Sequence, residues 1–390
     1  MYVIGLDVSK YKHDCFIATE AGEVIKDTFS FTNDAYGFSM FLSVLNNLDA
    51  TQEKRIGMEA TGHYGNNLMR FLNQNGLDFM IINPFLTEKS RQALSLRKTK
   101  TDKIDARIIS RMLLSLDYHT YSSKSYHISA LKSLTRFRET LIKSRSLYKV
   151  QIQNILDLTF PKFSSFFSNV FGVLPLRILK SYPSPQKIAA LNPLSTYTNL
   201  TKGLRGSFSY EKFKRIIEEA KITIGSSLPF YESELLSALE ALECFDKQID
   251  KVESEIEDIM NQYDFKILTI PGIGIQSAAV IVSEYGDFSL FESPAKMLAF
   301  AGMEPAIYQS GTQEFKGHMV KRGSPHLRYV LNNVVVPLIS FNPVFSSYYW
   351  KKRNEGKHHR VACSHVVRKL LRVIYYLETH KVDFNPNLLK

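Results

Sequence analysis

Short apolar runs bounded by turn residues mark the N-terminal part of the chain. The opening "MYVIGLDVSK" is an apolar run that ends in a polar step, and "HDCFIATEAGEVIKDTFSF" holds two β-rich runs around Ala21-Gly22, a hairpin signal. Helical periodicity in "AYGFSMFLSVLNNL" and "NNLMRFLNQNG" then alternates with the strand-like segments "RIGMEA" and "DFMIINP". Three meander strands followed by alternating helices and strands is the order of a ribonuclease-H-like α/β domain. We expect this domain to span residues 1–122.

Two long helical patterns occupy the middle of the chain. The first is basic and carries Arg136 and Arg138 on its polar surface; a solvated face is the usual explanation, and phosphate contact is the second. In the other pattern, apolar residues keep 3-4 spacing over more than three heptads, which is typical of a coiled coil. These apolar residues are Leu235, Leu242, Phe245, Ile249, Val252, Ile256 and Ile259. A dimeric coiled coil and an intramolecular pair of the two long helices explain the spacing equally well.

The remaining boundaries follow from these helices. Residues 123–263 form a helical and coiled-coil region, in which the aromatic segment 160–228, punctuated by Pro and Gly, predicts only short helices. Residues 264–390 form a mainly helical C-terminal domain. Its "IPGIG" matches a helix-hairpin-helix, whose Gly272 and Gly274 would let backbone N–H groups approach a phosphate. A tight helix-to-helix turn would use the two glycines equally well.

Charge narrows the class of partner. Lys and Arg number 49 against 38 Asp and Glu, which gives a formal charge of +11 and favours a polyanionic partner such as nucleic acid. No stretch approaches the ~20 apolar residues of a transmembrane helix, so we expect a cytosolic protein without a membrane partner. The three cysteines lie far apart and have no metal-binding spacing, which indicates reduced thiols rather than disulfides or a zinc site.

Four carboxylates could carry chemistry. Asp7 ends the first predicted strand and Glu59 the fourth, and the expected strand order makes these two ends neighbours. Asp102 and Asp105 lie three apart in "KTDKIDAR", on one face of a helix that begins there. Capping by Thr99 and the helix dipole explain the last two acids without any function. Together the four would repel one another unless cations occupied the site, which favours two Mg²⁺ ions ~4 Å apart.

Basic residues and one serine accompany these acids. The candidate phosphate-binding cations are Arg97, Lys98, Lys100, Lys103, Arg107, Arg136, Arg138, Lys316, Lys321, Arg322 and Arg328. Ser310 lies in "QSGT", which predicts a turn between short β segments. Since no His/Asp pair at a recognisable spacing accompanies Ser310, the residues alone favour a turn rather than a nucleophile.

With these motifs, the chain resembles the DEDD-type transposases of bacterial insertion sequences. The resemblance lies at both ends of the chain, through "IGLDVSK", "MEATGHYG", "INP", "KTDKIDAR", "IPGIG", "FAGMEPAIYQSG" and "KRGSPHLR". Such proteins are recombinases with a RuvC-like N-terminal domain, a coiled coil and a C-terminal domain that bears a catalytic serine. A compact member would have a shorter and less aromatic segment than 160–228.

The resemblance implies a role for each candidate. Asp7, Glu59, Asp102 and Asp105 would bind two Mg²⁺ ions, with Mn²⁺ as a substitute, and Ser310 would be the nucleophile that attacks DNA. The implied partners are donor and target DNA, a structured guide RNA from the element, and further copies in a dimer or tetramer. The protein would then excise and insert its own element in the bacterial cytosol and nucleoid.

Two other functions agree with the residues. One is a metal-dependent Holliday-junction resolvase or nuclease of ribonuclease-H-like fold, in which the carboxylates activate water and Ser310 has no chemical role. The other is a non-catalytic nucleic-acid-binding scaffold. Metal-independent binding without DNA breakage would favour the scaffold, and broken DNA without rejoining would favour the nuclease.

Overall fold

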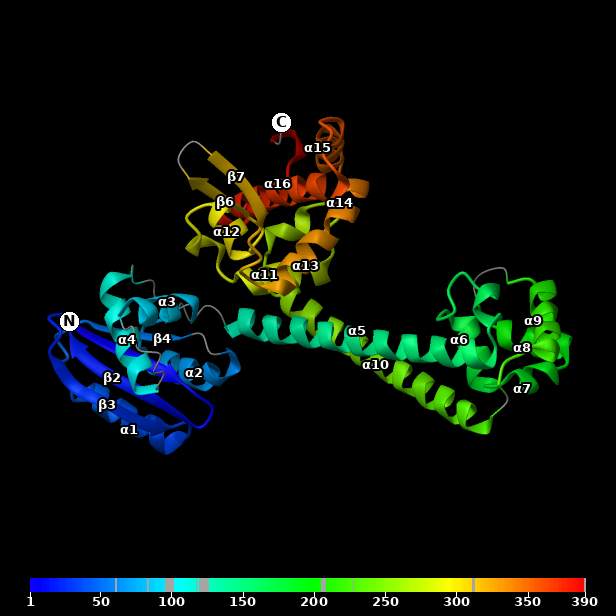
Figure 1. Ribbon diagram of the computed structural model, residues 1–390, viewed down its shortest axis with the longest axis horizontal. Helices are drawn as coiled ribbons and strands as arrows, with labels where there is room; N and C mark the ends of the chain where they lie inside the picture. The colour runs from blue at the N-terminus through cyan, green and yellow to red at the C-terminus, as the bar shows by residue number, and fades with distance from the viewer. Residues whose placement is uncertain are drawn as a thin grey trace. The chain divides into compact units, whose positions relative to one another are not determined.

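The computed structural model describes residues 1–59, 62–82, 84–94, 102–116, 118, 126–204, 208–226, 228–310 and 313–388. The chain divides into two compact units, Met1–Ser125 and Tyr126–Lys390 (Figure 1). Each unit has its own hydrophobic core and is described by itself.

The first unit contains a mixed sheet of five strands in the order β3-β2-β1-β4-β5. The strands are β1 Tyr2–Val8, β2 Lys12–Thr19, β3 Val24–Thr32, β4 Lys54–Glu59 and β5 Phe79–Ile82. Strands β1, β2 and β3 form an antiparallel meander, and β4 and β5 add in parallel beside β1. The predicted meander and the two later strands are therefore confirmed, and the mixed α/β arrangement is consistent with a ribonuclease-H-like fold.

Helices cover both faces of this sheet. Helices α1 (Ala35–Asn46) and α2 (Asn66–Gln74) bury one face, against Leu6 and Met58 among others. The other face is covered by α4 (Asp102–Ser115), and α3 (Pro84–Leu94) packs beside α4.

A glycine in β1 sets how closely α4 approaches the sheet. A Cβ atom at Gly5 would lie 2.1 Å from the carbonyl oxygen of Ala106, so no larger residue fits there without moving the helix. Ser110 Oγ donates a hydrogen bond to the carbonyl oxygen of Val3 at 3.1 Å. Close packing and this bond hold α4 across β1 at a fixed position along its length.

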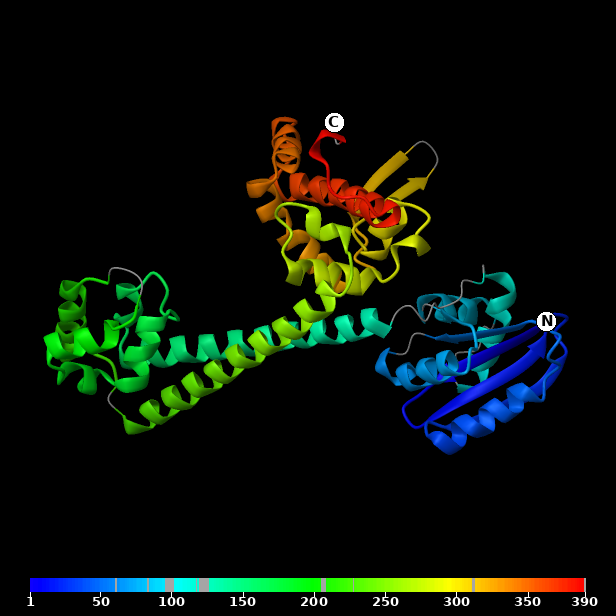
Figure 2. The same cartoon turned by 180° about the vertical axis from the view of Figure 1, so that it is seen from behind.

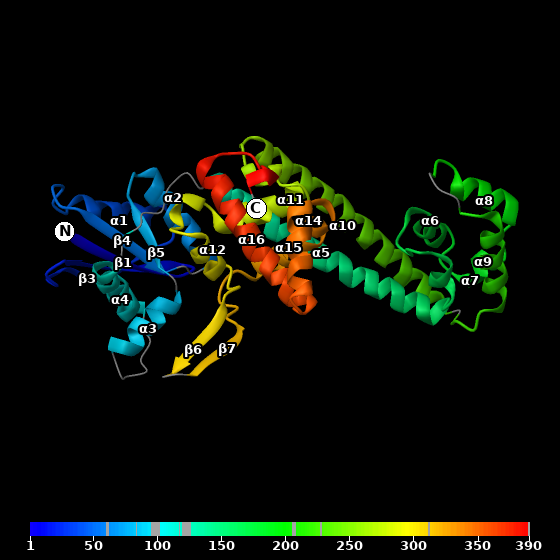
Figure 3. The same cartoon turned by 90° about the horizontal axis from the view of Figure 1, so that it is seen from above.

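In the second unit, the long helices α5 (Tyr126–Thr159) and α10 (Pro229–Asn261) run side by side (Figures 1 and 3). Leu242 and Ile249 of the heptad pattern are 2% and 4% exposed. Within one chain, α5 therefore covers part of the apolar heptad stripe of α10. This arrangement is the intramolecular alternative to a dimeric coiled coil. A dimer or tetramer stays a prediction.

The aromatic segment that the sequence left unassigned folds into short helices. These are α6 (Val173–Ser181), α7 (Pro185–Ala189), α8 (Pro193–Thr201) and α9 (Tyr210–Ile222). They gather at one end of the α5–α10 pair, as Figure 2 shows in green. Phe213 of α9 and Phe163, which precedes α6, are fully buried in a core shared with α5 and α10.

The other end of the α5–α10 pair carries the C-terminal elements. These are α11 Ile275–Tyr285, α12 Pro294–Phe300, β6 Pro305–Ser310, β7 Gln313–Met319, α13 Pro325–Asn333, α14 Val335–Phe341, α15 Pro343–Asn354 and α16 His359–His380. Apolar residues along α16, such as Val366 and Leu370, are fully buried in a core shared with α5, α10 and α11.

No single described helix has both the length and the apolarity that a membrane span requires. One pair, Pro325–Phe341 with Pro343–Asn354, has them jointly across a bend of 104°.

Candidate carboxylate site and basic residues

Asp7 and Glu59 lie on one face of the sheet, at the carboxyl ends of adjacent parallel strands. Leu6 of β1 pairs with Met58 of β4, and both side chains are buried beneath α1 and α2. Since successive side chains in a strand point to opposite faces, Asp7 and Glu59 belong to the face that α4 covers. Both residues are half-buried.

Asp105 approaches the same face from α4. Its neighbour Ala106 packs on Gly5, and Asp105 itself is only 4% exposed. Arg91 of α3 holds the carboxylate, with Nη1 at 3.2 Å from Oδ1 and 3.3 Å from Oδ2. A buried carboxylate requires such a positive partner, and here Arg91 supplies the positive charge.

Asp102 begins α4, one helical turn before Asp105, and its side chain lies outside the described residues. Three of the four predicted carboxylates therefore lie on the α4 face, and the backbone position of the fourth is one turn from Asp105. Within the described part of the chain, no three His, Cys, Asp or Glu side chains come close enough together to hold one metal ion.

A further carboxylate on this face escaped the sequence analysis. Asp14 of β2 lies directly opposite Asp7 in the antiparallel register and is 1% exposed. Ser30 Oγ donates to its carboxylate, and Lys12 Nζ lies 3.2 Å from Oδ2. The segment "HDCFIA" already indicated this position. Asp14, Phe16 and Ala18 are spaced two apart and therefore share one face of the strand, and Phe16 and Ala18 face α4, so the acid lies on a buried face.

The donor chemistry of this face fits a hard divalent cation. All its candidate ligands are carboxylate oxygens, the type that Mg²⁺ and Mn²⁺ prefer, and no thiol or imidazole lies among the predicted ligands. Arg91 forms an ion pair with Asp105, and Lys12 forms one with Asp14. The acids therefore have the chemistry for metal binding and are already partly neutralised by the protein.

Several predicted phosphate-binding cations have carboxylate partners within the fold. Arg136 pairs with Glu284 through Nε at 2.8 Å and Nη2 at 3.1 Å, and Arg138 Nε lies 2.6 Å from Glu253. Arg107 likewise pairs with Asp27. Phosphate contact by these three arginines stays a prediction, and any such contact would compete with an existing ion pair.

The other predicted cations fall into two groups. Arg328 Nη1 donates to the carbonyl oxygens of Ala301 at 3.2 Å and Gly323 at 2.9 Å, and Lys321 and Arg322 are exposed beside it. Arg97, Lys98 and Lys100, together with the side chains of Lys103 and Lys316, lie outside the described residues.

Glu284, the partner of Arg136, is the most deeply buried of these three carboxylates. Glu284 is 2% exposed, and Lys132 Nζ also lies 3.6 Å from its carboxylate. Burial alone would raise the pKa of Glu284, but Arg136 and Lys132 outweigh it and hold the pKa below its usual value. The carboxylate therefore stays ionised and joins α5 to α11.

Ser310 and the two glycines have clear backbone positions. Ser310 ends β6 and pairs with Gln313, the first residue of β7, while the Ser310 side chain lies outside the described residues. Gly272 has φ of +99°, and a Cβ atom there would lie 3.0 Å from Leu338 Cα, so packing and conformation both require glycine. A Cβ at Gly274, before α11, would meet no atom within 4 Å. Of these two glycines, Gly274 is the one with free space around its Cβ position.

Two family models match the chain, one over the first unit and α5 and the other over part of the C-terminal elements. Residues 4–161 match a transposase family of DEDD type, and residues 265–350 match the transposase family IS116/IS110/IS902. The chain belongs to this family of insertion-sequence transposases. The matched segments contain all four predicted carboxylates and Ser310, whereas α6 to α9 and all of α16 lie outside them.

Curated relatives of the transposase agree with this assignment. The pilin gene-inverting protein of Moraxella bovis is 23% identical over 390 residues, which cover 99% of this chain and 98% of the relative. The transposase for insertion sequence element IS1111A of Coxiella burnetii is 24% identical over 238 residues, 60% of this chain and 54% of the relative. An uncharacterized 43.6 kDa protein of insertion element IS110 from Streptomyces coelicolor is 24% identical over 166 residues, and this chain spans 40% of its length.

Proposed function

We propose that this transposase excises and inserts its own insertion sequence by phosphoryl transfer at a divalent-metal site. The observation that carries the proposal is that Asp7 and Glu59 lie on the sheet face that α4 covers. Asp105 lies on α4, and Asp102 is the first residue of that helix. These four residues would hold the ions, with Mg²⁺ as the metal. When bound, the ions would polarise the scissile phosphate and stabilise charge on its oxygens.

Ser310 is the proposed nucleophile. Its hydroxyl oxygen would form an ester bond to phosphorus as the bond from phosphorus to a deoxyribose oxygen breaks, and the serine proton would end on the departing hydroxyl. The ester would conserve the energy of the phosphodiester for rejoining, which hydrolysis by water would not. The family resemblance of "YQSG" supports this role, and the hairpin position of Ser310 agrees with presentation to a substrate.

The proposed partners follow from the family and the charge. Donor and target DNA would bind to a chain of formal charge +11 in the bacterial cytosol, and an element-encoded RNA would select the two DNA sites. The Moraxella relatives are named for gene inversion, so inversion of a DNA segment between two sites is the related outcome that an assay must score. A helix-hairpin-helix contact would be made through the open turn at Gly274.

A recombination assay on a plasmid that carries the element tests the carboxylates. Glu59→Gln removes one anionic ligand and should lower excision by at least about 100-fold. Glu53→Gln is the matched control, because Glu53 is exposed and immediately precedes the same strand. Equal excision by wild type and the Glu59 variant, with unchanged circular dichroism, would overturn the metal site.

The same assay tests the serine. Wild-type protein should give a protein–DNA adduct that survives denaturing electrophoresis and disappears on protease treatment. Ser310→Ala should give neither adduct nor recombinant while still binding DNA, and Ser293→Ala is its control, since the Ser293 side chain makes no capping hydrogen bond. Broken DNA without an adduct would instead identify a metal-dependent nuclease or resolvase.

A further inference from the structure

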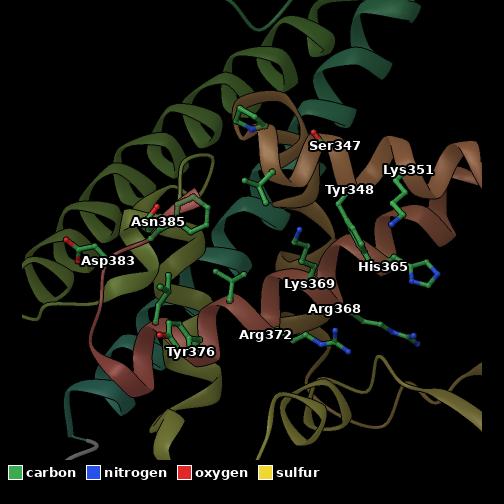
Figure 4. A pocket seen from close by; sticks show the side chains of 15 residues that line it. Ser347, Tyr348, Lys351, His365, Arg368, Lys369, Arg372, Tyr376, Asp383 and Asn385 are labelled. Carbon is green, nitrogen blue, oxygen red and sulfur yellow. The ribbon is translucent and has the colours of Figure 1, made fainter. Parts of the chain in front are cut away.

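A basic groove lies between α15 and α16 in the second unit. It has a volume of about 1090 Å³, and its walls carry Tyr348 and Lys351 from α15 and Arg368, Lys369, Arg372 and Tyr376 from α16 (Figure 4). Arg368 and Arg372 lie side by side along α16. The α16 wall and Lys351 lie beyond the last residue matched by either family model.

None of the four cations of this groove forms an ion pair with a described carboxylate. In the part of the chain that the structure describes, Lys351, Arg368, Lys369 and Arg372 have no carboxylate partner. Arg368 and Arg372 are four residues apart on one helix, a spacing at which like charges repel each other and destabilise the helix. The groove therefore contains a cluster of positive charges that repel one another.

The acids around the groove form their ion pairs with lysines outside this cluster. Asp383 lines the groove, but its carboxylate lies 3.0 Å from Nζ of Lys266, which is outside the groove. Glu355 pairs with Lys352 at 2.8 Å, and the charge of Lys351 also acts on its carboxylate. The C-terminal tail that carries Asp383 is itself fixed, because the N–H of Phe384 donates to Thr269 Oγ1 at 2.8 Å.

Neighbouring cations add to the effect of burial on the pKa of two residues at the groove. Burial lowers the pKa of Lys369, and the charge of Lys351 lowers it further. Burial also lowers the pKa of His365, with Lys352 and Arg368 adding to the effect. A bound anion would relieve this repulsion, since it favours the charged form of each group.

Two tyrosines give the groove aromatic surfaces beside its charges. Lys369 Nζ lies 4.9 Å from the centroid of the Tyr348 ring, and Tyr376 is 48% exposed. Aromatic faces beside backbone-binding cations are the features with which proteins hold single-stranded nucleic acid, because an unpaired base offers a face for stacking. The bases of a duplex are stacked on one another inside the helix and would not stack on the tyrosine rings.

We propose that the α15–α16 groove binds a segment of unpaired nucleotides, with phosphates at Arg368, Lys369 and Arg372 and bases against Tyr348 and Tyr376. The inference concerns binding and does not depend on the carboxylate site. It can therefore fail while the proposed recombination chemistry holds, and the reverse is also true.

Fluorescence anisotropy on the full chain tests the phosphate contacts. The probes are labelled oligo(dT), oligo(U) and a mixed-sequence DNA duplex, each about 20 nucleotides or base pairs long. Replacing Arg368, Lys369 and Arg372 with Gln should weaken single-strand binding about tenfold or more and reduce its salt slope by about 2. The matched control replaces Lys212, Arg215 and Lys221 with Gln, because these exposed cations on α9 share their helix with acids.

The control triple should leave single-strand affinity within about twofold of wild type. An equal loss from both triples would show that affinity follows total charge, and it would overturn the groove as the site. Tighter binding of oligo(dT) or of oligo(U) supports the proposal and assigns DNA or RNA as the source.

A stacking variant separates unpaired bases from a duplex. Tyr376→Leu should weaken single-strand binding about fivefold or more, whereas Tyr376→Phe keeps the ring and should retain affinity. Duplex binding should be the same for both variants. Equal loss of duplex and single-strand affinity in Tyr376→Leu, or no loss of either, would overturn the stacking role.

Discussion

The basic residues of α5 and those of α16 look alike in sequence and differ in their surroundings. Arg136, Arg138 and Arg145 of α5 each lie against a carboxylate from α10 or α11, with Arg145 Nη1 2.9 Å from Asp246. Arg368 and Arg372 of α16 have no such partner among the described residues. The α5 charges join helices together, whereas the α16 charges are left for a ligand.

This difference has an energetic basis. A buried carboxylate such as Glu284 costs several kcal/mol unless a cation pairs with it, so the α5 arginines are needed by the fold. A cluster of unpaired cations lowers the stability of the fold by a smaller amount, through mutual repulsion. The same cations contribute favourable binding free energy when a polyanion binds. Stability measurements and binding measurements should therefore separate the two helices.

The largest stability effect is expected at Arg136. Arg136→Met removes two hydrogen bonds to the buried Glu284, and among the described residues only Lys132 remains as its cation. We expect a loss of about 2–3 kcal/mol in the free energy of unfolding, measured by urea denaturation. The double variant Arg136→Met with Glu284→Leu should recover part of the loss, because it also removes the unpaired buried charge. A change below about 0.5 kcal/mol in the single variant would contradict the structural role of Arg136.

A smaller effect is expected on acidification. The pKa of Glu284 is lower in the folded chain than its ordinary value of 4.5, so its contribution to stability is complete above that value. That contribution should be lost as the pH falls through the folded pKa. Thermal unfolding of wild type and of Glu284→Gln should therefore differ most near neutral pH and converge in acid. A constant difference across the range would show that Glu284 does not titrate as inferred.

Some of the carboxylate site could be predicted because strands alternate strictly. Asp7 and Glu59 each end an apolar strand, so strand order and alternation were enough to bring them to one face. Asp14 was not predicted because it lies inside β2, whereas the predicted acids lie at strand ends. Its place beside Asp7 depends on the register of β1 and β2, which the sequence alone leaves open.

The packing partners of the two long helices could not be predicted from the sequence, for a different reason. The heptad pattern shows that α10 buries an apolar stripe, but a dimer partner and α5 would bury that stripe equally well. Likewise, nothing local to Arg136 predicts Glu284, which is 148 residues away in the chain. Long-range pairing decides which charges remain for a ligand, so a list of basic residues cannot separate structural arginines from binding ones.

The smallest effect is expected at Arg368, and it has the opposite sign from that at Arg136. Arg368→Gln removes a repulsion with Arg372, breaks no ion pair among the described residues, and keeps good helix propensity. We expect the free energy of unfolding to rise by about 0.2–0.5 kcal/mol, and the gain should shrink at high salt because salt screens the repulsion. Urea denaturation at low and high salt measures it, with Arg215→Gln on α9 as the control. A destabilised Arg368 variant would mean that this arginine, like Arg136, is part of the fold, and the contrast between α5 and α16 would then disappear.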